Sequence, residues 1–285
     1  MELHDIKTIN SLLRRHGFSF SRSLGQNFLI DPYICPKMAD LSGVGADSGV
    51  IEIGTGIGVL TKELALRAAK VVSFEADRRL LPVLSETMDG LLNVKIINAD
   101  FLKCDLAALL EELGGMDLYV CANLPYYITS PVIMKLVESR LFSKSMTFMV
   151  QKEAAERFTA EVGSREAGAV TVAVNYFARV TSLFPVSKDA FLPSPKVDSK
   201  VIRFDIREKP EFTPLNEGFF FKTVKSLFAQ RRKTAANALS AGLKLPKTDM
   251  ETVLRTIGKP ANVRGETLTM EELVRLSDGI YGLTI

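Results

Sequence analysis

The sequence predicts an α/β protein whose sheet is followed by a small all-α domain. Between residues 49 and 206, short β-rich runs alternate with segments of helical periodicity, a pattern typical of a doubly wound parallel sheet. Residues 207–216 contain two prolines and mixed charge, which indicates a linker. Beyond this linker the periodicity is helical throughout. We therefore expect a sheet domain over residues 1–206 and a helical domain over residues 217–285.

The expected strands are rich in β-branched residues and are bounded by turn signals. They are GVIEIG, KVVSFE, NVKIINAD, MDLYVCAN and SMTFMVQ. Two later runs, VTSLFP and SKVIRFDI, flank a proline-rich turn and indicate a terminal hairpin-type pair. Helical spacing follows the first strand over residues 59–69. In the carboxyl-terminal part we expect helices over residues 219–229, 234–240, 249–257 and 270–277.

Composition narrows the class of protein and of chemistry. The 285 residues are 47% hydrophobic, which is enough for one substantial core and a second, small one. Neither a signal peptide nor an apolar run near the ~20 residues of a membrane span is present, so we expect a cytoplasmic protein. Three dispersed cysteines predict neither disulfides nor a metal site. The only histidines, His4 and His16, are expected to be exposed helix residues, which argues against most histidine-dependent nucleophile sites.

A glycine-rich turn and three carboxylates indicate a ligand site at the edge of the sheet. Gly54 and Gly56 lie between the first strand and its helix, with a GxGxG spacing in place of the GxGxxG of dinucleotide sites. Glu52, Glu75 and Asp100 occupy the carboxyl ends of successive strands. Clustered carboxylates repel phosphate and favour a nucleoside that carries positive charge. The cationic nucleoside S-adenosylmethionine is therefore the expected ligand, with Glu75 positioned for its ribose hydroxyls.

The stretch ANLPYYITSP follows another strand and lies at the same edge. An exocyclic amine of a base is a poor nucleophile because its lone pair is delocalised into the ring. The Asn123 side-chain oxygen and the carbonyl of Leu124 or Pro125 could accept both amine hydrogens and turn the lone pair towards a methyl donor. Tyr126 would stack on a base taken out of its helix or loop. The alternative is an ordinary turn with a buried tyrosine.

Eight motifs together resemble one enzyme family. They are GQNFL, EIGTGIG, FEAD, NAD, NLPYY, QKEAAER, FLPSPKVDS and FAQRRKTAANAL. The chain is similar to the ribosomal RNA adenine dimethyltransferases from about residue 18 to its carboxyl end. The resemblance implies a Rossmann-like class I S-adenosylmethionine-dependent methyltransferase fold. Its PSPKVDS and RRK segments are more similar to the small-subunit branch than to the branch that modifies large-subunit rRNA.

That branch implies an activity. Enzymes of this branch dimethylate N6 of two adjacent adenosines in the 3′-terminal hairpin loop of 16S rRNA. The resemblance also implies a role in small-subunit biogenesis. Two alternatives stay open from the residues alone: a large-subunit rRNA adenine N6-methyltransferase, and a non-catalytic ribosome-assembly factor that keeps the fold. A protein or small-molecule N-methyltransferase is a further rival, although it would not need a basic helical domain.

The resemblance also implies roles for individual residues of the donor site. Asn27 and Leu29 would surround the methionine end of the donor, with Gly54 in the glycine turn. Glu75 would bind the ribose hydroxyls, and Asp100 the adenine amino group.

On the acceptor side, the resemblance implies that Asn123 contacts both donor and acceptor. Gln26 would close over the same cavity, and Phe191 would stack on the target adenine opposite Tyr126.

Basic residues of the helical domain favour an RNA partner. No acidic residue occurs from Gly218 to Thr248. The residues expected to contact phosphates are Lys222, Lys225, Arg231, Arg232 and Lys233, and Lys244 and Lys247 fall in the same stretch. A solvated helix face is the alternative. The expected partner is 16S rRNA within an immature 30S-type particle, bound by a monomer, without membrane or metal.

Overall fold

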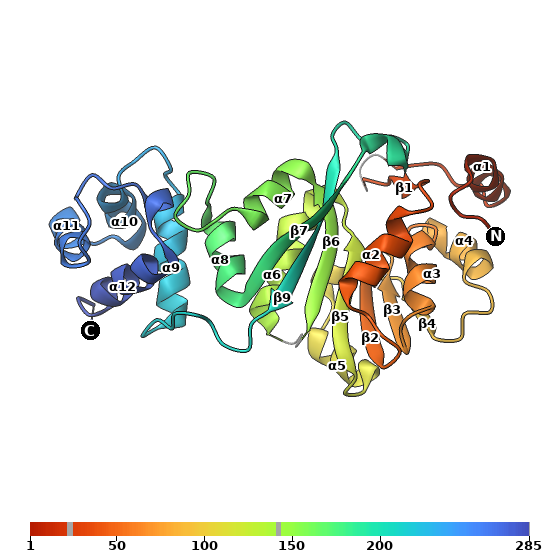
Figure 1. Ribbon diagram of the computed structural model, residues 1–285, viewed down its shortest axis with the longest axis horizontal. Helices are drawn as coiled ribbons and strands as arrows, with labels where there is room; N and C mark the ends of the chain where they lie inside the picture. Colours follow the sequence, from red (N-terminus) through yellow and green to blue (C-terminus); the bar gives the residue numbers. More distant parts are fainter. Residues whose placement is uncertain (22–24, 141–143, 285) are drawn as a thin grey trace. The chain divides into compact units, whose positions relative to one another are not determined.

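The computed structural model describes residues 1–21, 25–140 and 144–284 (Figure 1). The described chain divides into two compact units. Met1–Ala155 and Arg179–Ile206 form the first, which we call the sheet unit. Glu156–Ala178 and Arg207–Ile285 form the second, the helical unit.

In the described part of the sheet unit, seven strands form one sheet in the order β4-β3-β2-β5-β6-β9-β7 (Figure 1). Their bounds are β2 Ser48–Ile53, β3 Lys70–Phe74, β4 Val94–Ile97, β5 Asp117–Asn123, β6 Ser145–Gln151, β7 Ala178–Val186 and β9 Ser199–Ile206. The strands from β2 to β6 pair in parallel, as predicted. β9 runs antiparallel to β6, and β7 lies beside β9 at the edge of the sheet. The sheet is therefore mixed, and not wholly parallel as the sequence had predicted. The two later runs predicted as a pair are therefore neighbours.

Strand order explains where a ligand can bind. The chain proceeds from β2 outward through β3 to β4, and then returns to the other side of β2 with β5 and β6. Crevices form at such a reversal, beyond the carboxyl ends of the strands. β2 leads to the glycine turn and β5 ends at Asn123, so the turns after these two strands flank the reversal.

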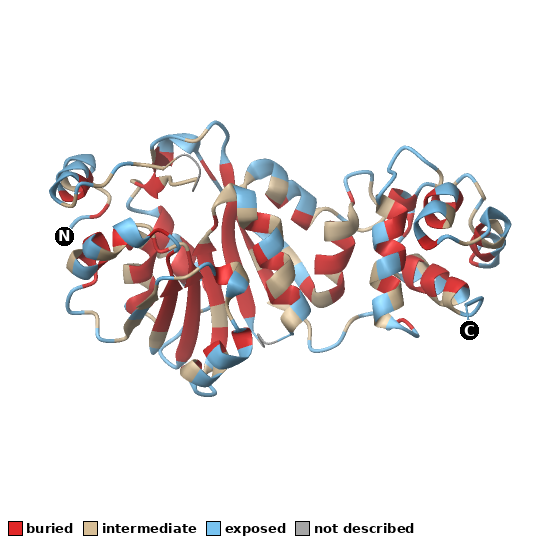
Figure 2. Cartoon of the chain, turned by 180° about the vertical axis from the view of Figure 1, so that it is seen from behind, coloured by how far each residue is buried: buried red, intermediate tan, exposed pale blue. Residues whose placement is uncertain are grey.

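Helices cover the sheet. They are α2 Ile34–Ser42, α3 Val59–Ala65, α4 Leu81–Thr87, α5 Leu106–Leu113 and α6 Thr129–Ser139. Every residue of β2 is buried, as expected of a strand covered on both faces, and Figure 2 shows the central strands of the sheet mostly buried. Met38 of α2 and Leu64 of α3 belong to the same apolar cluster as Val50 of β2. Among the described helices, none has the length and apolar composition of a membrane span.

The amino-terminal helix α1 (Ile6–Arg15) corrects one prediction. His4 precedes this helix and is half-buried. His16 follows it, and its imidazole Nε2 lies 2.8 Å from Glu86 Oε2. Both histidines were expected to be exposed helix residues, and that was wrong. The apolar face of α1, with Ile9 and Leu12 buried, packs beside α4 and brings His16 to Glu86.

Short segments that periodicity did not predict also form structure. β1 (Phe28–Leu29) pairs antiparallel with β8 (Phe191–Leu192), so that Leu29 lies opposite Phe191. This pairing joins the GQNFL and FLPSPKVDS motifs, which are far apart in the sequence.

The helical unit contains more chain than residues 217–285. Its helices are α8 Ala169–Phe177, α9 Glu217–Phe228, α10 Ala235–Leu243, α11 Lys247–Thr256 and α12 Met270–Tyr281. Tyr176 of α8 packs on Phe220 of α9, and its hydroxyl donates to Glu217 Oε2 at 3.0 Å. α8 therefore belongs to the core of this unit, while α7 (Lys152–Thr159) runs across the boundary between the units.

Candidate active site

A cavity of about 420 Å³ lies at the carboxyl edge of the sheet. It is lined by every residue that the sequence suggested for the donor and the acceptor. These are Gln26, Asn27, Leu29, Glu52, Gly54, Gly56, Glu75, Asp100, Asn123, Leu124, Pro125, Tyr126 and Phe191. They come from six separate stretches of the chain, and the strand order brings them together.

Glu75 follows β3 and is almost completely buried. Its Oε2 accepts a hydrogen bond from the Gly56 amide at 2.9 Å, and its Oε1 accepts one from the Asp77 amide at 2.8 Å. Burial raises the pKa of this carboxyl. Each oxygen keeps a further lone pair, so the carboxylate is preoriented to accept two hydroxyl groups from a ligand in the cavity.

Glu52 is more deeply buried, with an exposed fraction of 1%. Its Oε2 accepts from Thr61 Oγ1 at 2.7 Å and from Ser73 Oγ at 2.6 Å. Burial raises the pKa of Glu52 to about 8. Without a ligand this side chain is therefore mostly neutral at pH 7, which corrects the expectation of three negative charges along this edge.

The glycine turn touches the turn that follows β5. Gly54 has a φ of 84°, and its amide donates to the Phe74 carbonyl at 2.8 Å. A Cβ atom at this position would lie 3.6 Å from the Asn123 carbonyl oxygen and 3.6 Å from Pro125 Cδ. Both distances are ordinary van der Waals contacts, so glycine is favoured here by the left-handed backbone and not by lack of space.

The carbonyls of Leu124 and Pro125 differ in their hydrogen bonding. The Leu124 amide donates to the Met149 carbonyl at 3.1 Å, which ties the turn to β6. The Pro125 carbonyl accepts from the Ile128 amide at 3.2 Å and from Thr129 Oγ1 at 3.3 Å. Within the described residues, no donor reaches the Leu124 carbonyl. Of the two carbonyls that the sequence left open, that of Leu124 has the free acceptor capacity.

Two aromatic side chains differ in how they are held. The Tyr126 hydroxyl lies 2.9 Å from Ser199 Oγ, and burial raises the pKa of this phenol. Phe191 lines the cavity but is only 3% exposed, because it packs in the apolar cluster that contains Leu29 and Ile34. Tyr126 is therefore the more accessible ring.

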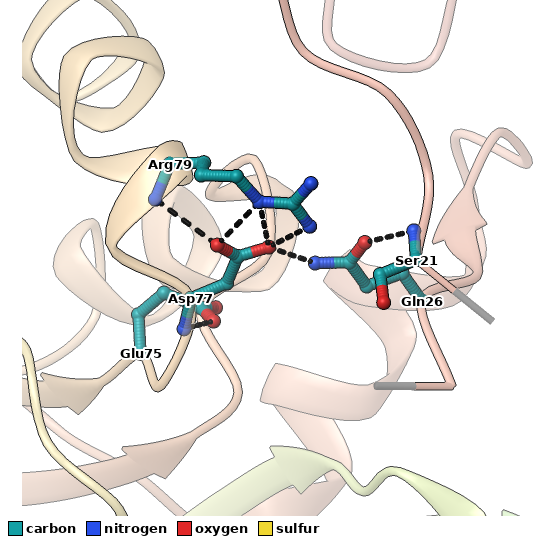
Figure 3. Close-up of polar contacts among 5 residues, drawn as sticks. All are labelled: Ser21, Gln26, Glu75, Asp77 and Arg79. Carbon is teal, nitrogen blue, oxygen red and sulfur yellow. Dashed lines mark hydrogen bonds and ion pairs between the residues drawn. The ribbon is translucent and has the colours of Figure 1, made fainter. Parts of the chain in front are cut away.

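The amino-terminal segment reaches the cavity through side-chain hydrogen bonds. Asn27 Nδ2 donates to the Gly25 carbonyl at 3.1 Å. The Gln26 amide bonds to the Ser21 backbone and to the Asp77 carboxylate, as Figure 3 shows. Gln26 was predicted to contact the cofactor; its amide is engaged with protein groups beside the cavity.

The loop after β4 holds Asp100. Its Oδ1 accepts from the Leu102 amide at 3.0 Å and begins the short helix η3 (Phe101–Lys103). Lys135 Nζ from α6 donates to the carbonyls of this loop, those of Phe101 at 3.2 Å, Leu102 at 2.8 Å and Cys104 at 2.7 Å. Sequence reasoning missed Lys135, Ser199 and Asp77. Ser199 and Asp77 had a signal, because they end the FLPSPKVDS and FEAD motifs, whereas Lys135 had none.

The basic residues belong to the helical unit. Lys222 and Lys225 are exposed on α9, and Arg231, Arg232 and Lys233 are exposed in the turn between α9 and α10. Arg231 NH2 donates to the carbonyls at positions 165 and 167, at 2.8 and 3.2 Å. Lys247 lies 3.2 Å from Glu251. The described residues contain no group of three or more side chains suited to a metal ion.

Comparison with known proteins identifies the family. A sequence profile described as "Ribosomal RNA adenine dimethylase" matches residues 17–278. The chain belongs to the ribosomal RNA adenine dimethylase family.

Curated relatives agree with this membership. A protein of Shouchella clausii named "Ribosomal RNA small subunit methyltransferase A" is 47% identical over 276 residues, covering 95% of this chain and 93% of the relative. A protein of the same name from Geobacillus thermodenitrificans is 47% identical over 277 residues, with coverages of 95% and 94%. Both relatives match along nearly their whole length.

Solved structures show the same fold. A dimethyladenosine transferase from Plasmodium falciparum superposes with a TM-score of 0.73 at 26% identity, covering 87% of this chain and 95% of that one. The 23S rRNA methyltransferase ErmE gives 0.70 at 27% identity, covering 90% and 100%. The Rossmann-like methyltransferase fold predicted from the sequence is thereby confirmed.

Proposed function

We propose that this chain, a ribosomal RNA adenine dimethyltransferase, dimethylates N6 of two adjacent adenosines in the 3′-terminal hairpin loop of 16S rRNA. One observation carries the proposal. Glu75, whose carboxylate is preoriented, and Leu124, whose carbonyl has no donor among the described residues, line one cavity, in which a nucleoside donor and an amine acceptor can meet.

S-adenosylmethionine fits the donor side of the cavity. The two oxygens of Glu75 can accept the ribose hydroxyls, and Asp100 can accept from the adenine amino group. The methionine end of the donor would contact Asn27, Leu29 and the turn at Gly54. Glu52 beneath the glycine turn can become charged when a cationic ligand enters, because a nearby positive charge favours the ionised carboxylate. When bound, S-adenosylmethionine supplies an activated methyl group.

The acceptor side can orient an amine. The Asn123 side-chain oxygen and the Leu124 carbonyl accept the two N6 hydrogens, so that the nitrogen lone pair points towards the methyl group. Tyr126 stacks on the adenine ring, and the hydrogen bond between its hydroxyl and Ser199 fixes the orientation of the tyrosine ring. Methyl transfer to the neutral amine gives a cationic nitrogen, which is acidic enough to lose its proton to water. A general base is therefore not needed.

The small-subunit branch is favoured over the large-subunit branch by degree of similarity. Relatives named for the small subunit are 47% identical, whereas ErmE is 27% identical. The proposed substrate is 16S rRNA in an immature 30S-type particle, because rRNA recognition depends on folded shape and on splayed loop bases. The exposed basic residues of the helical unit would contact its phosphates. Action as a monomer in the cytoplasm is part of the same proposal.

Mass spectrometry of nucleosides tests this function. Small subunits that lack the modification are incubated with the protein and S-adenosylmethionine, and we expect N6,N6-dimethyladenosine at two adjacent positions. Asn123→Ala is the control, because it should lose about 100-fold or more in rate while it still binds the subunit. Unmodified adenosine after incubation with the folded wild-type protein would refute the proposal. In a parallel incubation with large subunits, modification of 23S rRNA in the absence of 16S modification would favour the large-subunit branch.

A further inference from the structure

A buried carboxylate lies behind the donor site and does not line the cavity. Asp77 is 6% exposed, and it stands two residues beyond Glu75. Its backbone amide donates to Glu75 Oε1 at 2.8 Å. The residue therefore already supports the group expected to bind the donor's ribose.

The Asp77 side chain also reaches the amino-terminal segment. Gln26 Nε2 donates to Asp77 Oδ2 at 2.8 Å, while Gln26 Oε1 accepts from the Ser21 amide at 2.8 Å (Figure 3). This arrangement is directional. A reversed Gln26 amide would set its NH2 group against the Ser21 N–H and its oxygen against the Asp77 carboxylate.

Arg79 fixes the carboxylate from the other side. Its Nε and backbone amide donate to Asp77 Oδ1 at 2.9 and 3.0 Å, and its NH2 donates to Oδ2 at 2.7 Å. These bonds hold the pKa of Asp77 at about 2, so the side chain stays ionised and acts only as an acceptor. A rigid acceptor thus faces Gln26 at every physiological pH.

We propose that Asp77 is a positioning residue for the donor site, which acts through Gln26 to place the Gly25–Leu29 segment and through its backbone to place Glu75. The segment that Gln26 holds contains Asn27 and Leu29, both on the cavity wall. A Cβ at Gly25 would lie 3.7 Å from Tyr127 Cδ1, so this segment also abuts the acceptor turn. The inference rests on the proposed donor, S-adenosylmethionine.

An exchange of hydrogen-bond polarity tests the inference. In Asp77→Asn, the side-chain oxygen keeps the bonds from the Arg79 amide and Nε, whereas the new NH2 group opposes both Gln26 Nε2 and the Arg79 NH2. In Gln26→Glu, two carboxylates oppose each other. The double variant Gln26→Glu/Asp77→Asn restores a donor facing an acceptor, keeps the Ser21 bond and leaves net charge unchanged.

We expect each single variant to raise the Kd and the KM for S-adenosylmethionine about 10-fold, with kcat at saturating donor within about 3-fold of wild type. The Gln26 contact is restored in the double variant but the Arg79 NH2 contact is not, so its donor affinity should lie between those of Asp77→Asn and wild type. Asp105→Asn is the matched control. Like Asp77, Asp105 accepts a hydrogen bond from the amide of the residue two positions later: the Ala107 amide donates to Asp105 Oδ1 at 2.9 Å. Asp105 lies on an exposed turn outside the cavity. The affinity of the Asp105→Asn variant for S-adenosylmethionine should not change.

Calorimetry on the wild type is read first. If the wild type does not bind S-adenosylmethionine, the proposed donor is wrong. If it binds, single variants with normal affinity, or a double variant that binds no better than Asp77→Asn, would overturn only the positioning role. Should Asp77→Asn not fold, Gln26→Met decides, because it removes both amide bonds and leaves Asp77 intact. Normal donor affinity in folded Gln26→Met would also overturn the inference.

Discussion

Glu75 shows how one side chain can be prepared for a ligand. Both of its oxygens already accept a backbone amide, from Gly56 and from Asp77. In Glu75→Gln, the new NH2 group must face one of these N–H donors, and an acceptor for a ribose hydroxyl is lost. We expect the affinity for S-adenosylmethionine to fall about 10- to 100-fold, from a cost of ~1 to 3 kcal/mol. Calorimetry measures this change, and a folded variant with normal affinity would contradict the ribose assignment.

The raised pKa of Glu52 predicts that the stability of the folded protein depends on pH. Its pKa is raised from the ordinary 4.5 to about 8 in the folded protein, so the folded state binds this proton more tightly than the unfolded state. The stabilisation is present in full below pH 4.5, falls as the pH rises from 4.5 to about 8, and is absent above that. Glu52→Gln cannot titrate. Without donor, the free energy of unfolding of wild type minus that of the variant should therefore decrease by up to about 1.4 kcal/mol per pH unit in this window.

Urea denaturation at several pH values between 5 and 8.5 gives this difference directly. Other titrating groups are shared by both proteins and cancel in the subtraction. A difference that stays constant with pH would mean that Glu52 is already ionised in the folded protein.

At the scale of elements, α6 connects the two halves of the site. The helix begins directly after the acceptor turn, and its Lys135 bonds to three carbonyls of the loop that starts at Asp100. Lys135→Met keeps the length of the side chain and removes all three bonds. We expect a loss of about 2 kcal/mol in stability and weaker donor binding, because Asp100 loses its support.

Lys103→Met is the control for this prediction. Lys103 lies in the same loop, but its ammonium is 3.8 Å from Asp100 Oδ2 and its side chain is 84% exposed. An exposed pair of this kind contributes little. Thermal unfolding and donor titration of both variants compare the two lysines, and equal effects would show that the carbonyl contacts of Lys135 do not matter.

At the scale of the whole molecule, donor binding and RNA binding should be separable, because the donor cavity is lined by residues of the sheet unit alone. Arg232 and Lys233 are exposed in the helical unit, whereas Arg231 is also bonded to backbone carbonyls. Arg232→Gln/Lys233→Gln should weaken subunit binding and lower the slope of log affinity against log salt by about 1.4 to 1.8. Donor affinity should not change.

Lys247→Gln/Arg255→Gln is the matched control, with the same loss of charge. Both side chains face Glu251, at 3.2 and 4.0 Å, and are partly neutralised by it. The control should therefore leave the salt slope nearly intact. If filter binding gave the same slope for wild type and for Arg232→Gln/Lys233→Gln, these residues would be a solvated surface and the rRNA would be bound elsewhere.

The residues of the site were predictable where a regular element carries them. Glu52, Glu75, Asp100 and Asn123 each end or follow a strand with a clear period, and parallel strands have their carboxyl ends at one edge of a sheet. That geometry follows from the alternation of strands and helices in the sequence. The motifs around these residues were also enough to indicate the family.

Contacts between distant segments were not predictable. The two-residue strands that bring Leu29 to Phe191 are too short to have a period, and α8 joins the helical unit through tertiary contacts with α9, such as that of Tyr176 with Phe220. The neutral state of Glu52 and the bond from Gln26 to Asp77 depend on burial and on distance in space. The sequence by itself determined which groups face the cavity. Their protonation, orientation and support were decided only by the tertiary structure, because desolvation and hydrogen-bond geometry arise when separate segments pack together.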